Sequence, residues 1–166
     1  MVPPEHAGTT RRRERDIAAA CRVAIRIWKS GRGSSEALQF LANSSSHYLE
    51  RAILIVTVPT AAGQPRLVAS AGLPSEFVAG FGALDFGLQA DRSTPAEGTE
   101  AEQLPPLLAK HGISASWSTP IHSTHGQVLG WLKLYGTSLR EANAMEIAAQ
   151  ATVVQTIARI LEGSAA

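Results

Sequence analysis

The sequence predicts a single α+β domain in which helices from both ends of the chain pack beside an antiparallel sheet. Three observations carry this prediction: apolar residues at helical spacing near the N-terminus, paired β-rich runs joined by turns in the middle, and a long apolar-periodic segment at the C-terminus. At 166 residues, the chain is long enough for one domain with a real core and too short for two ordinary domains.

The composition is that of a soluble globular protein. Hydrophobic residues make up 45% of the chain, charged residues 17%, and the net charge is +1, which argues against a disordered chain and against a nucleic-acid partner. The only cysteine, Cys21, excludes an internal disulfide and a cysteine-based zinc site. No apolar run approaches the roughly 20 residues of a membrane span, and no secretory signal is visible. We therefore expect a cytoplasmic protein without a membrane partner.

The N-terminal part is expected to comprise a flexible leader over residues 1–14 and a helix over 15–31, within a domain that spans 15–163. The leader holds prolines and a glycine without helical periodicity. The basic run 11–15 is interpreted as a solvated helix start, because it lacks the interleaved aromatic residues of a nucleic-acid site. The apolar stripe of this first helix consists of Ile17, Cys21, Ala24 and Trp28.

The sheet core is expected within 34–136. Gly31 and Gly33 end the first helix, and Ser34 or Ser35 can cap a second helix. The inner face of that second helix is predicted to consist of Leu38, Leu41, Ala42, Ser45 and Leu49. The predicted strands are 52–58, 66–71, 113–122 and 127–135, and the predicted short helices begin near Pro74 and Pro105. Residues 82–101 yield no assignment.

The C-terminal helix is expected over 138–162. Ser138–Glu141 fits a capping box, and two apolar stripes follow it. One stripe comprises Ile147, Ala151, Val154, Ala158 and Leu161, and the other comprises Val153, Ile157 and Ile160. Two stripes need two partners. The sheet can cover one of them, and either the first helix or a second copy of the chain can cover the other, so we expect a homodimer formed through the terminal helices.

Four stretches of the chain resemble the GAF domains of bacterial sensors and regulators. They are 54–56, 67–74, 112–121 and 126–130, and their order and spacing match that family. The resemblance spans about residues 34–162. It implies a six-stranded antiparallel sheet with helices on one face and a small-ligand cavity formed by connecting segments on the other.

One strand is similar to that of a GAF subgroup that reads Ala-Cys-Trp-Ser, but here Ser116 replaces the cysteine. The glycine-cysteine-glycine loop of that subgroup also has no match in 81–98. The resemblance therefore implies a sensory function with a remodelled pocket wall.

The candidate ligand-binding residues are aromatic or hydroxyl-bearing. Trp117 and Thr119 share a parity and point to the same side of their strand. An apolar pocket with a few hydrogen-bond donors suits a small anion or a compact organic molecule. The predicted lining is Trp117, Thr119, Phe77, Phe81, Phe86, Trp131 and Tyr135.

Catalysis and metal binding are not expected. Cys21 falls on an apolar helical stripe, where a thiol stays protonated and packs as a small hydrophobe. His122 and His125 flank a hairpin turn and supply only two of the four ligands that a closed zinc site needs. No cofactor is expected, although a haem held by His111 or His47 is an alternative.

Two functions from different classes follow from these observations. The first is a sensory or regulatory domain that binds a small molecule and signals through its terminal helices to a partner protein. The second is a ligandless dimerisation or scaffold module whose own side chains fill the cavity. A stabilising ligand distinguishes the two, because only the first should gain stability from one.

Overall fold

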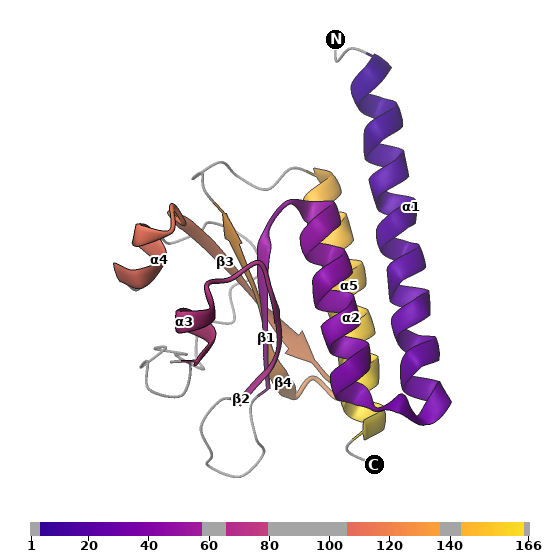
Figure 1. Ribbon diagram of the computed structural model, residues 1–166. Helices are drawn as coiled ribbons and strands as arrows, with labels where there is room; N and C mark the ends of the chain where they lie inside the picture. The colour runs from indigo at the N-terminus through magenta and orange to yellow at the C-terminus, as the bar shows by residue number, and fades with distance from the viewer. Residues whose placement is uncertain (1–3, 58–65, 80–105, 137–143, 165–166) are drawn as a thin grey trace.

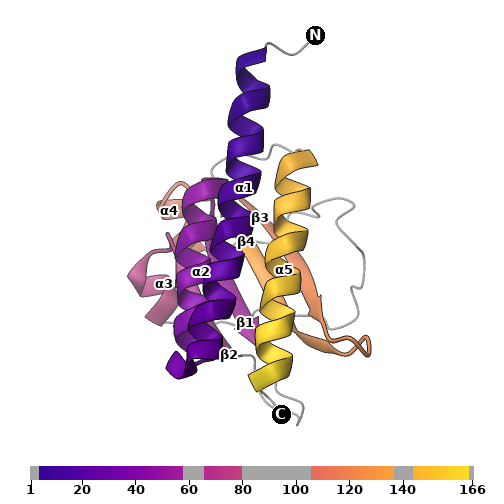
Figure 2. The same ribbon diagram turned by 90° about the vertical axis from the view of Figure 1, so that its right-hand side faces the viewer.

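The computed structural model describes residues 4–57, 66–79, 106–136 and 144–164 (Figure 1). Its elements, in chain order, are α1 (Pro4–Ile27), the π-helical turn η1 (Trp28–Arg32), α2 (Ser34–Leu49), β1 (Ala52–Thr57), β2 (Arg66–Ala71), α3 (Ser75–Ala79), α4 (Pro106–Lys110), β3 (Ala115–His122), β4 (Val128–Gly136) and α5 (Ala144–Ser164). Helices α2 and α5 cover one face of the sheet, and α1 lies outside them (Figures 1 and 2). The short helices α3 and α4 lie on the other face.

The described strands form one antiparallel sheet of four strands in the order β2-β1-β4-β3. Strands β1 and β4 therefore occupy its middle. Both strands are almost wholly buried, which explains why their sequences are apolar on both parities. The family resemblance implies six strands, whereas the described residues form four, so the count of six stays a prediction.

Strand alternation divides the interior into two separate cores. Ile53 and Ile55 of β1 pair with Leu134 and Leu132 of β4, and all four pack against α2 and α5. We call this side of the sheet the helical face. The intervening residues point to the side of α3 and α4, which we call the pocket face. The pocket-face core consists of Leu54, Val56, Phe77, Leu108, Ile113 and Tyr135.

The N-terminal prediction is wrong in one respect. Helix α1 begins at Pro4, so the expected leader over 1–14 is helical from that residue onward. Proline suits the first turn of a helix, and no later proline interrupts the segment before Ile27. An ion pair of 2.9 Å between Arg13 of α1 and Glu50 also ties the early part of this helix to the domain.

The boundary between the first two long helices lies where the sequence predicts it. Gly31 and Gly33 have φ values of 86° and 98°, which side-chain-bearing residues rarely adopt. All five residues of the predicted inner face of α2 are buried. The expected serine cap is wrong, because Gly33 occupies the cap position and no side chain bonds there.

Helix α5 packs against both the sheet and α1, so the predicted contact between the terminal helices is confirmed. Its stripe of Val153, Ile157 and Ile160 is buried. A side chain on Gly163 would collide with the ring of Trp28, which shows how closely the ends of α5 and the first helical segment meet. The proposed capping box at 138–141 lies outside the described residues. None of the described helices is long and apolar enough to span a membrane.

Candidate functional site

A pocket of about 450 Å³ opens on the pocket face, at the end of the sheet where β1 begins and β4 finishes. Four segments that are distant in sequence contribute to it: the α2–β1 corner, the β2–α3 connection, the α4–β3 connection and the end of β4. Its described lining is Glu50, Ala52, Gly72, Leu73, Pro74, His111, Ile113, Tyr135 and Gly136. The walls thus combine apolar and polar surface, and the polar groups include one carboxylate, one imidazole and one phenol.

The backbone at the pocket rim is shaped by residues with positive φ. Glu50 ends α2 in the left-handed conformation, with φ of 54°, and its N–H donates to the Ser46 carbonyl. Gly72 and Gly112 have φ of 74° and 75°, and they turn the chain out of β2 and out of α4. A left-handed residue costs a glycine little and costs a glutamate about 1 kcal/mol or more. The conformation of Glu50 is therefore imposed by its surroundings.

Three of the predicted ligand-binding residues lie on the pocket face. Tyr135 lines the pocket, and its ring meets that of Phe77 edge-on with 6.1 Å between centroids. Trp131 pairs with Val56 across the sheet, which places it on the same face, and it is 7% exposed. Phe81 and Phe86 lie outside the described residues.

Trp117 and Thr119 lie on the helical face, so the structure separates them from the other predicted site residues. They share a side of β3, as their parity predicts. The register decides which side this is, because Trp117 pairs with Leu134 and Thr119 with Leu132, and both leucines belong to the helical-face core. Thr119 accepts a hydrogen bond from Gln150 of α5. The parity of β3 was visible in the sequence, whereas its register with β4 was not.

The sequence analysis gave no ligand role to two buried polar residues of the pocket face. Ser116 faces Tyr135 across the β3–β4 ladder, is 6% exposed, and its hydroxyl has no hydrogen-bond partner. Lys133 faces Ser118 and Leu54 on the same side and is 4% exposed. A lysine inside an otherwise apolar strand was the sequence signal for the second of these, since lysine is almost never buried without a role.

Comparison with known proteins reveals similarity in structure alone. No protein-family model matches the sequence, and no curated protein is significantly similar to it. The GAF domain of a phosphoenolpyruvate-protein phosphotransferase from Coxiella burnetii superimposes with a TM-score of 0.70 at 20% identity, covering 92% of this chain and 96% of that one. The corresponding domain from Acinetobacter gives 0.59 at 13% identity, covering 90% and 94%. The phycocyanobilin-bound GAF domain of a cyanobacterial phytochrome gives 0.63 at 13% identity, covering 89% and 94%.

The chain has the fold of a GAF domain. The family resemblance seen in the sequence is therefore supported at the level of the fold. The coverage matters here, because almost the whole of each neighbour is matched by almost the whole of this chain. No separate output domain is included in the match.

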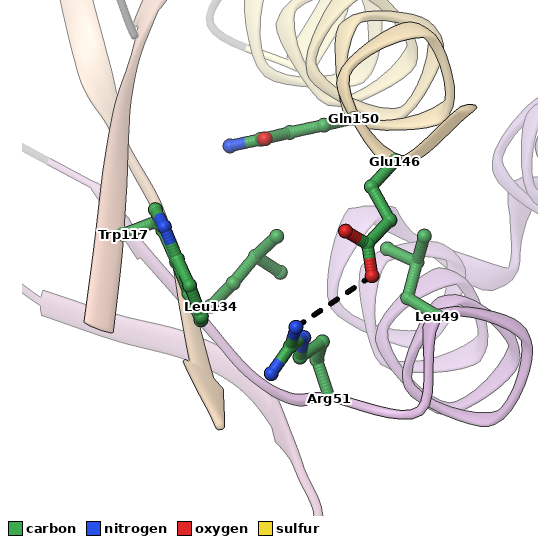
Figure 3. Close-up of a pocket in the computed structure, with 6 residues that line it drawn as sticks. All are labelled: Leu49, Arg51, Trp117, Leu134, Glu146 and Gln150. Carbon is green, nitrogen blue, oxygen red and sulfur yellow. Dashed lines mark ion pairs between the residues drawn. The ribbon is translucent and has the colours of Figure 1, made fainter. Parts of the chain in front are cut away.

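The helical face of this GAF fold holds a charged cluster that the sequence analysis missed (Figure 3). The guanidinium of Arg51 lies 3.6 Å from Glu146 of α5 and 4.6 Å from the ring centroid of Trp117. The side chains of Arg51 and Glu146 are only 8% and 7% exposed. A side chain on Gly136 would collide with Arg51, so the glycine leaves room for the guanidinium. The cavity beside them measures about 10 Å³, which is room for about one water molecule.

The α2–β1 corner thus connects the pocket to both terminal helices. Glu50 lines the pocket and pairs with Arg13 of α1, while the next residue, Arg51, pairs with Glu146 of α5. Ser46 holds the corner in place, because its hydroxyl donates to the Arg51 carbonyl at 2.6 Å. Two adjacent residues of one corner therefore contact both sides of the sheet.

Cys21 is placed for packing. It is 6% exposed and belongs to the helical-face core. Burial raises the pKa of its thiol, although a hydrogen bond with the Thr156 side chain and the charge of Arg22 act in the opposite direction. A thiol in this setting stays protonated at neutral pH and is a poor nucleophile.

The histidines are distributed around the fold. His122 and His125 lie exposed near the β3–β4 turn, and His47 is exposed on α2 beside the ring of Tyr48. Within the described part of the chain, no three metal-ligating side chains of histidine, cysteine or acidic type come together. His111 is the one described histidine in the pocket lining, so the haem alternative now depends on it alone.

Proposed function

We propose that this chain is a sensory or regulatory GAF domain that binds a compact organic molecule or a small anion in the pocket beside Tyr135. The pocket carries the proposal. Its volume of about 450 Å³ falls within the roughly 300–1,000 Å³ of typical small-molecule sites, and its lining offers both apolar and polar surface. The phytochrome neighbour binds phycocyanobilin, which supports the view that this fold accommodates an organic ligand.

One buried hydroxyl supplies specificity in this proposal. The Ser116 hydroxyl lies across from Tyr135 without a partner, and a buried polar group in that condition costs about 1–3 kcal/mol. A ligand that reaches Ser116 from the pocket recovers that energy. Phe77 supports the site through its edge-on ring contact with Tyr135.

Signalling requires that the ligand bind one arrangement of the terminal helices better than another. The α2–β1 corner provides the connection, because its residues contact the pocket, α1 and α5 at once. A tenfold preference corresponds to roughly 1.4 kcal/mol, which is comparable to the strength of a few such contacts.

A homodimer is part of the proposal. Its structural basis is the exposed beginning of one apolar stripe of α5. Ile147 is 48% exposed, the only large apolar side chain so exposed among the described residues. Ala151, one turn later on the same stripe, is exposed as well. A second copy that covers this edge of α5 removes both side chains from water. We place the protein in the reducing cytoplasm, where a lone thiol persists.

The test is a thermal-shift and native mass-spectrometry screen of the full chain against nitrate, phosphate, the amino acids and cyclic nucleotides. A ligand present at 100 times its Kd stabilises the folded state by about 2.7 kcal/mol. Ala52→Phe should abolish this shift, because Ala52 lines the pocket and the larger side chain fills it. Trp117→Phe is the matched control on the helical face, and it should keep the shift.

The outcomes separate the candidate functions. A shift that survives Ala52→Phe but disappears in Trp117→Phe contradicts the placement of the ligand on the pocket face. If no probe binds the wild-type protein, the ligandless dimerisation module is favoured. A visible absorbance band in freshly purified protein that is lost in His111→Ala supports the haem alternative.

A further inference from the structure

The outer side of α1 carries a row of arginines. Arg11, Arg15, Arg22 and Arg26 are separated by four, seven and four residues, and all four are exposed. Because each helical residue advances by about 100°, they fall within about 60° of arc and extend over about 23 Å of the helix. We call these four residues the arginine stripe. Figure 2 looks onto this side of the molecule, with α2 and α5 behind α1.

The stripe is opposite the packed side of α1. The inner side is buried against α2 and α5 and consists of Ile17, Ala20, Cys21 and Ala24. The acidic residues between positions 11 and 26, Glu14 and Asp16, both fall outside the arc of the stripe. The stripe therefore presents positive charge alone, on a chain whose net charge is only +1.

Among the described residues, no ion pair is seen at the stripe. The pairs Arg13–Glu50, Arg32–Glu36 and Arg51–Glu146 all use other residues. A solvated helix face ordinarily mixes both signs of charge, because unlike charges one turn apart stabilise a helix while like charges oppose it. Arg11 with Arg15, and Arg22 with Arg26, are like-charged pairs of that kind.

We infer that the arginine stripe is the docking surface for an acidic amphipathic helix of a partner protein. Arg15 and Arg22 lie seven residues apart, as do Ala18 and Ile25 beside them. Both pairs are thus in register with a helix packed at the shallow angle of a coiled coil. Ala18 and Ile25 are only partly exposed and offer a narrow apolar seam, while the arginines bind carboxylates along its edge.

Charge and composition disfavour other occupants. A nucleic-acid-binding domain is usually strongly basic overall, whereas the net charge of this chain is only +1. A helix that lies in a membrane surface buries its apolar side in the lipid, whereas the apolar side of α1 is already packed against α2 and α5. A second copy of this chain would place the same arginines against one another, since a twofold contact is self-complementary.

This inference rests on the proposed function, because it names the chemistry of the partner that reads the terminal helices. It does not depend on the pocket ligand, so the two can fail separately. The probe is a synthetic helical peptide with glutamates at heptad spacing beside alanine and leucine, and its matched control has glutamine in place of every glutamate. Binding to the full chain is measured by fluorescence anisotropy at low and high salt.

The expected result is binding of the acidic peptide that weakens with salt and is about tenfold weaker for Arg15→Gln with Arg22→Gln. The control variant, Arg66→Gln with Lys110→Gln, removes the same charge from exposed positions outside α1 and should bind within about twofold of wild type. Circular dichroism of both variants verifies that α1 remains helical.

Four outcomes overturn the inference: equal losses for both variants, equal binding of the neutral peptide, binding of a 20-bp duplex or phosphatidylglycerol vesicles without binding of the peptide, or tighter self-association as the only effect of removing the stripe. If Ala52→Phe loses the thermal shift but still binds the peptide, the result concerns the pocket alone, and the inference about the docking surface holds.

Discussion

The two faces of the sheet solve the same burial problem in different ways. The helical face is covered by long helices and holds two paired polar contacts, Arg51 with Glu146 and Thr119 with Gln150, beside the unpartnered hydroxyl of Ser45. The pocket face has a smaller core under two short helices, a cavity of about 450 Å³ and the unpartnered Ser116 hydroxyl. The helical face therefore contributes most of the stability, whereas the features that suit a ligand lie on the pocket face.

The largest expected effect comes from deleting matched leucines on the two faces. Leu41 and Leu108 are both fully buried, the first on α2 in the helical-face core and the second on α4 in the pocket-face core. Leu41→Ala should lower the free energy of unfolding by about 4 kcal/mol and Leu108→Ala by about 2 kcal/mol, because the smaller core can collapse around the lost side chain. Urea unfolding measures both. Equal costs would break the comparison.

The buried ion pair comes next. Glu146→Gln should destabilise the protein by about 3 kcal/mol, since it leaves the Arg51 charge buried without its counter-charge. The double variant Arg51→Met with Glu146→Leu should recover most of that loss. The exposed counterpart, Arg13→Gln, should cost less than about 1 kcal/mol. Equal losses in the free energy of unfolding for Glu146→Gln and Arg13→Gln would show that the buried pair in Figure 3 contributes no more than an exposed one.

A pair of serines sharpens the comparison further. Ser45 on α2 and Ser116 on β3 are both buried, and neither hydroxyl has a hydrogen-bond partner. Ser45→Ala and Ser116→Ala should each change stability by about 1 kcal/mol or less, in the stabilising direction. Only Ser116→Ala should also reduce the thermal shift produced by a pocket ligand. A similar reduction in both variants would remove Ser116 from the site.

An alkaline titration tests the packing of α1. The pKa of Cys21 is raised on folding, so between the unfolded and folded pKa values the native state holds more protons than the unfolded state. The thiol contribution is therefore complete below the unfolded value, about 8.5, and is lost as pH rises through the folded pKa. Wild type should lose more stability than Cys21→Ala over this range, as measured by urea unfolding. If the free energy of unfolding depends on pH equally in both proteins, the Cys21 thiol is not buried in the folded state.

The smallest effect is expected at the pocket rim. Glu50→Gly relieves the left-handed backbone of Glu50 by about 1 kcal/mol but raises the entropy of the unfolded chain and removes a surface ion pair. The free energy of unfolding should therefore change by no more than about 0.5 kcal/mol. Hydrogen exchange is the more informative measurement, because it should show a changed response of α1 to ligand. A large destabilisation would mean that the corner is a structural anchor rather than a connection.

Much of the fold was visible in the sequence because it is local. The β-rich runs, the glycines after Trp28 and the periodicity of the long helices each depend on neighbouring residues. The helical start at Pro4 was missed, since the leader has no apolar stripe to mark it. The site was only partly visible: Phe77, Trp131 and Tyr135 do share a face, but Trp117 does not. That assignment depends on the strand register, which is set by contacts across the sheet.

The charged residues of the site were harder still to predict. Arg51 and Glu146 are far apart in sequence and meet only when α5 packs on the sheet. Nothing in the local sequence of either distinguishes a buried ion pair from two solvated side chains. The same holds for Ser116, whose lack of a partner is a property of the folded interior.

The three tryptophans of the chain fall at three different boundaries between its layers. Trp28 lies against Gly163 where the terminal helices meet, Trp117 lies under Arg51, and Trp131 is buried on the pocket face of the sheet. Indole emission depends on local polarity, so a set of variants that each retain a single tryptophan would report on one boundary at a time. Stopped-flow fluorescence of that set could then establish the order in which the layers respond, with no dye attached to the protein.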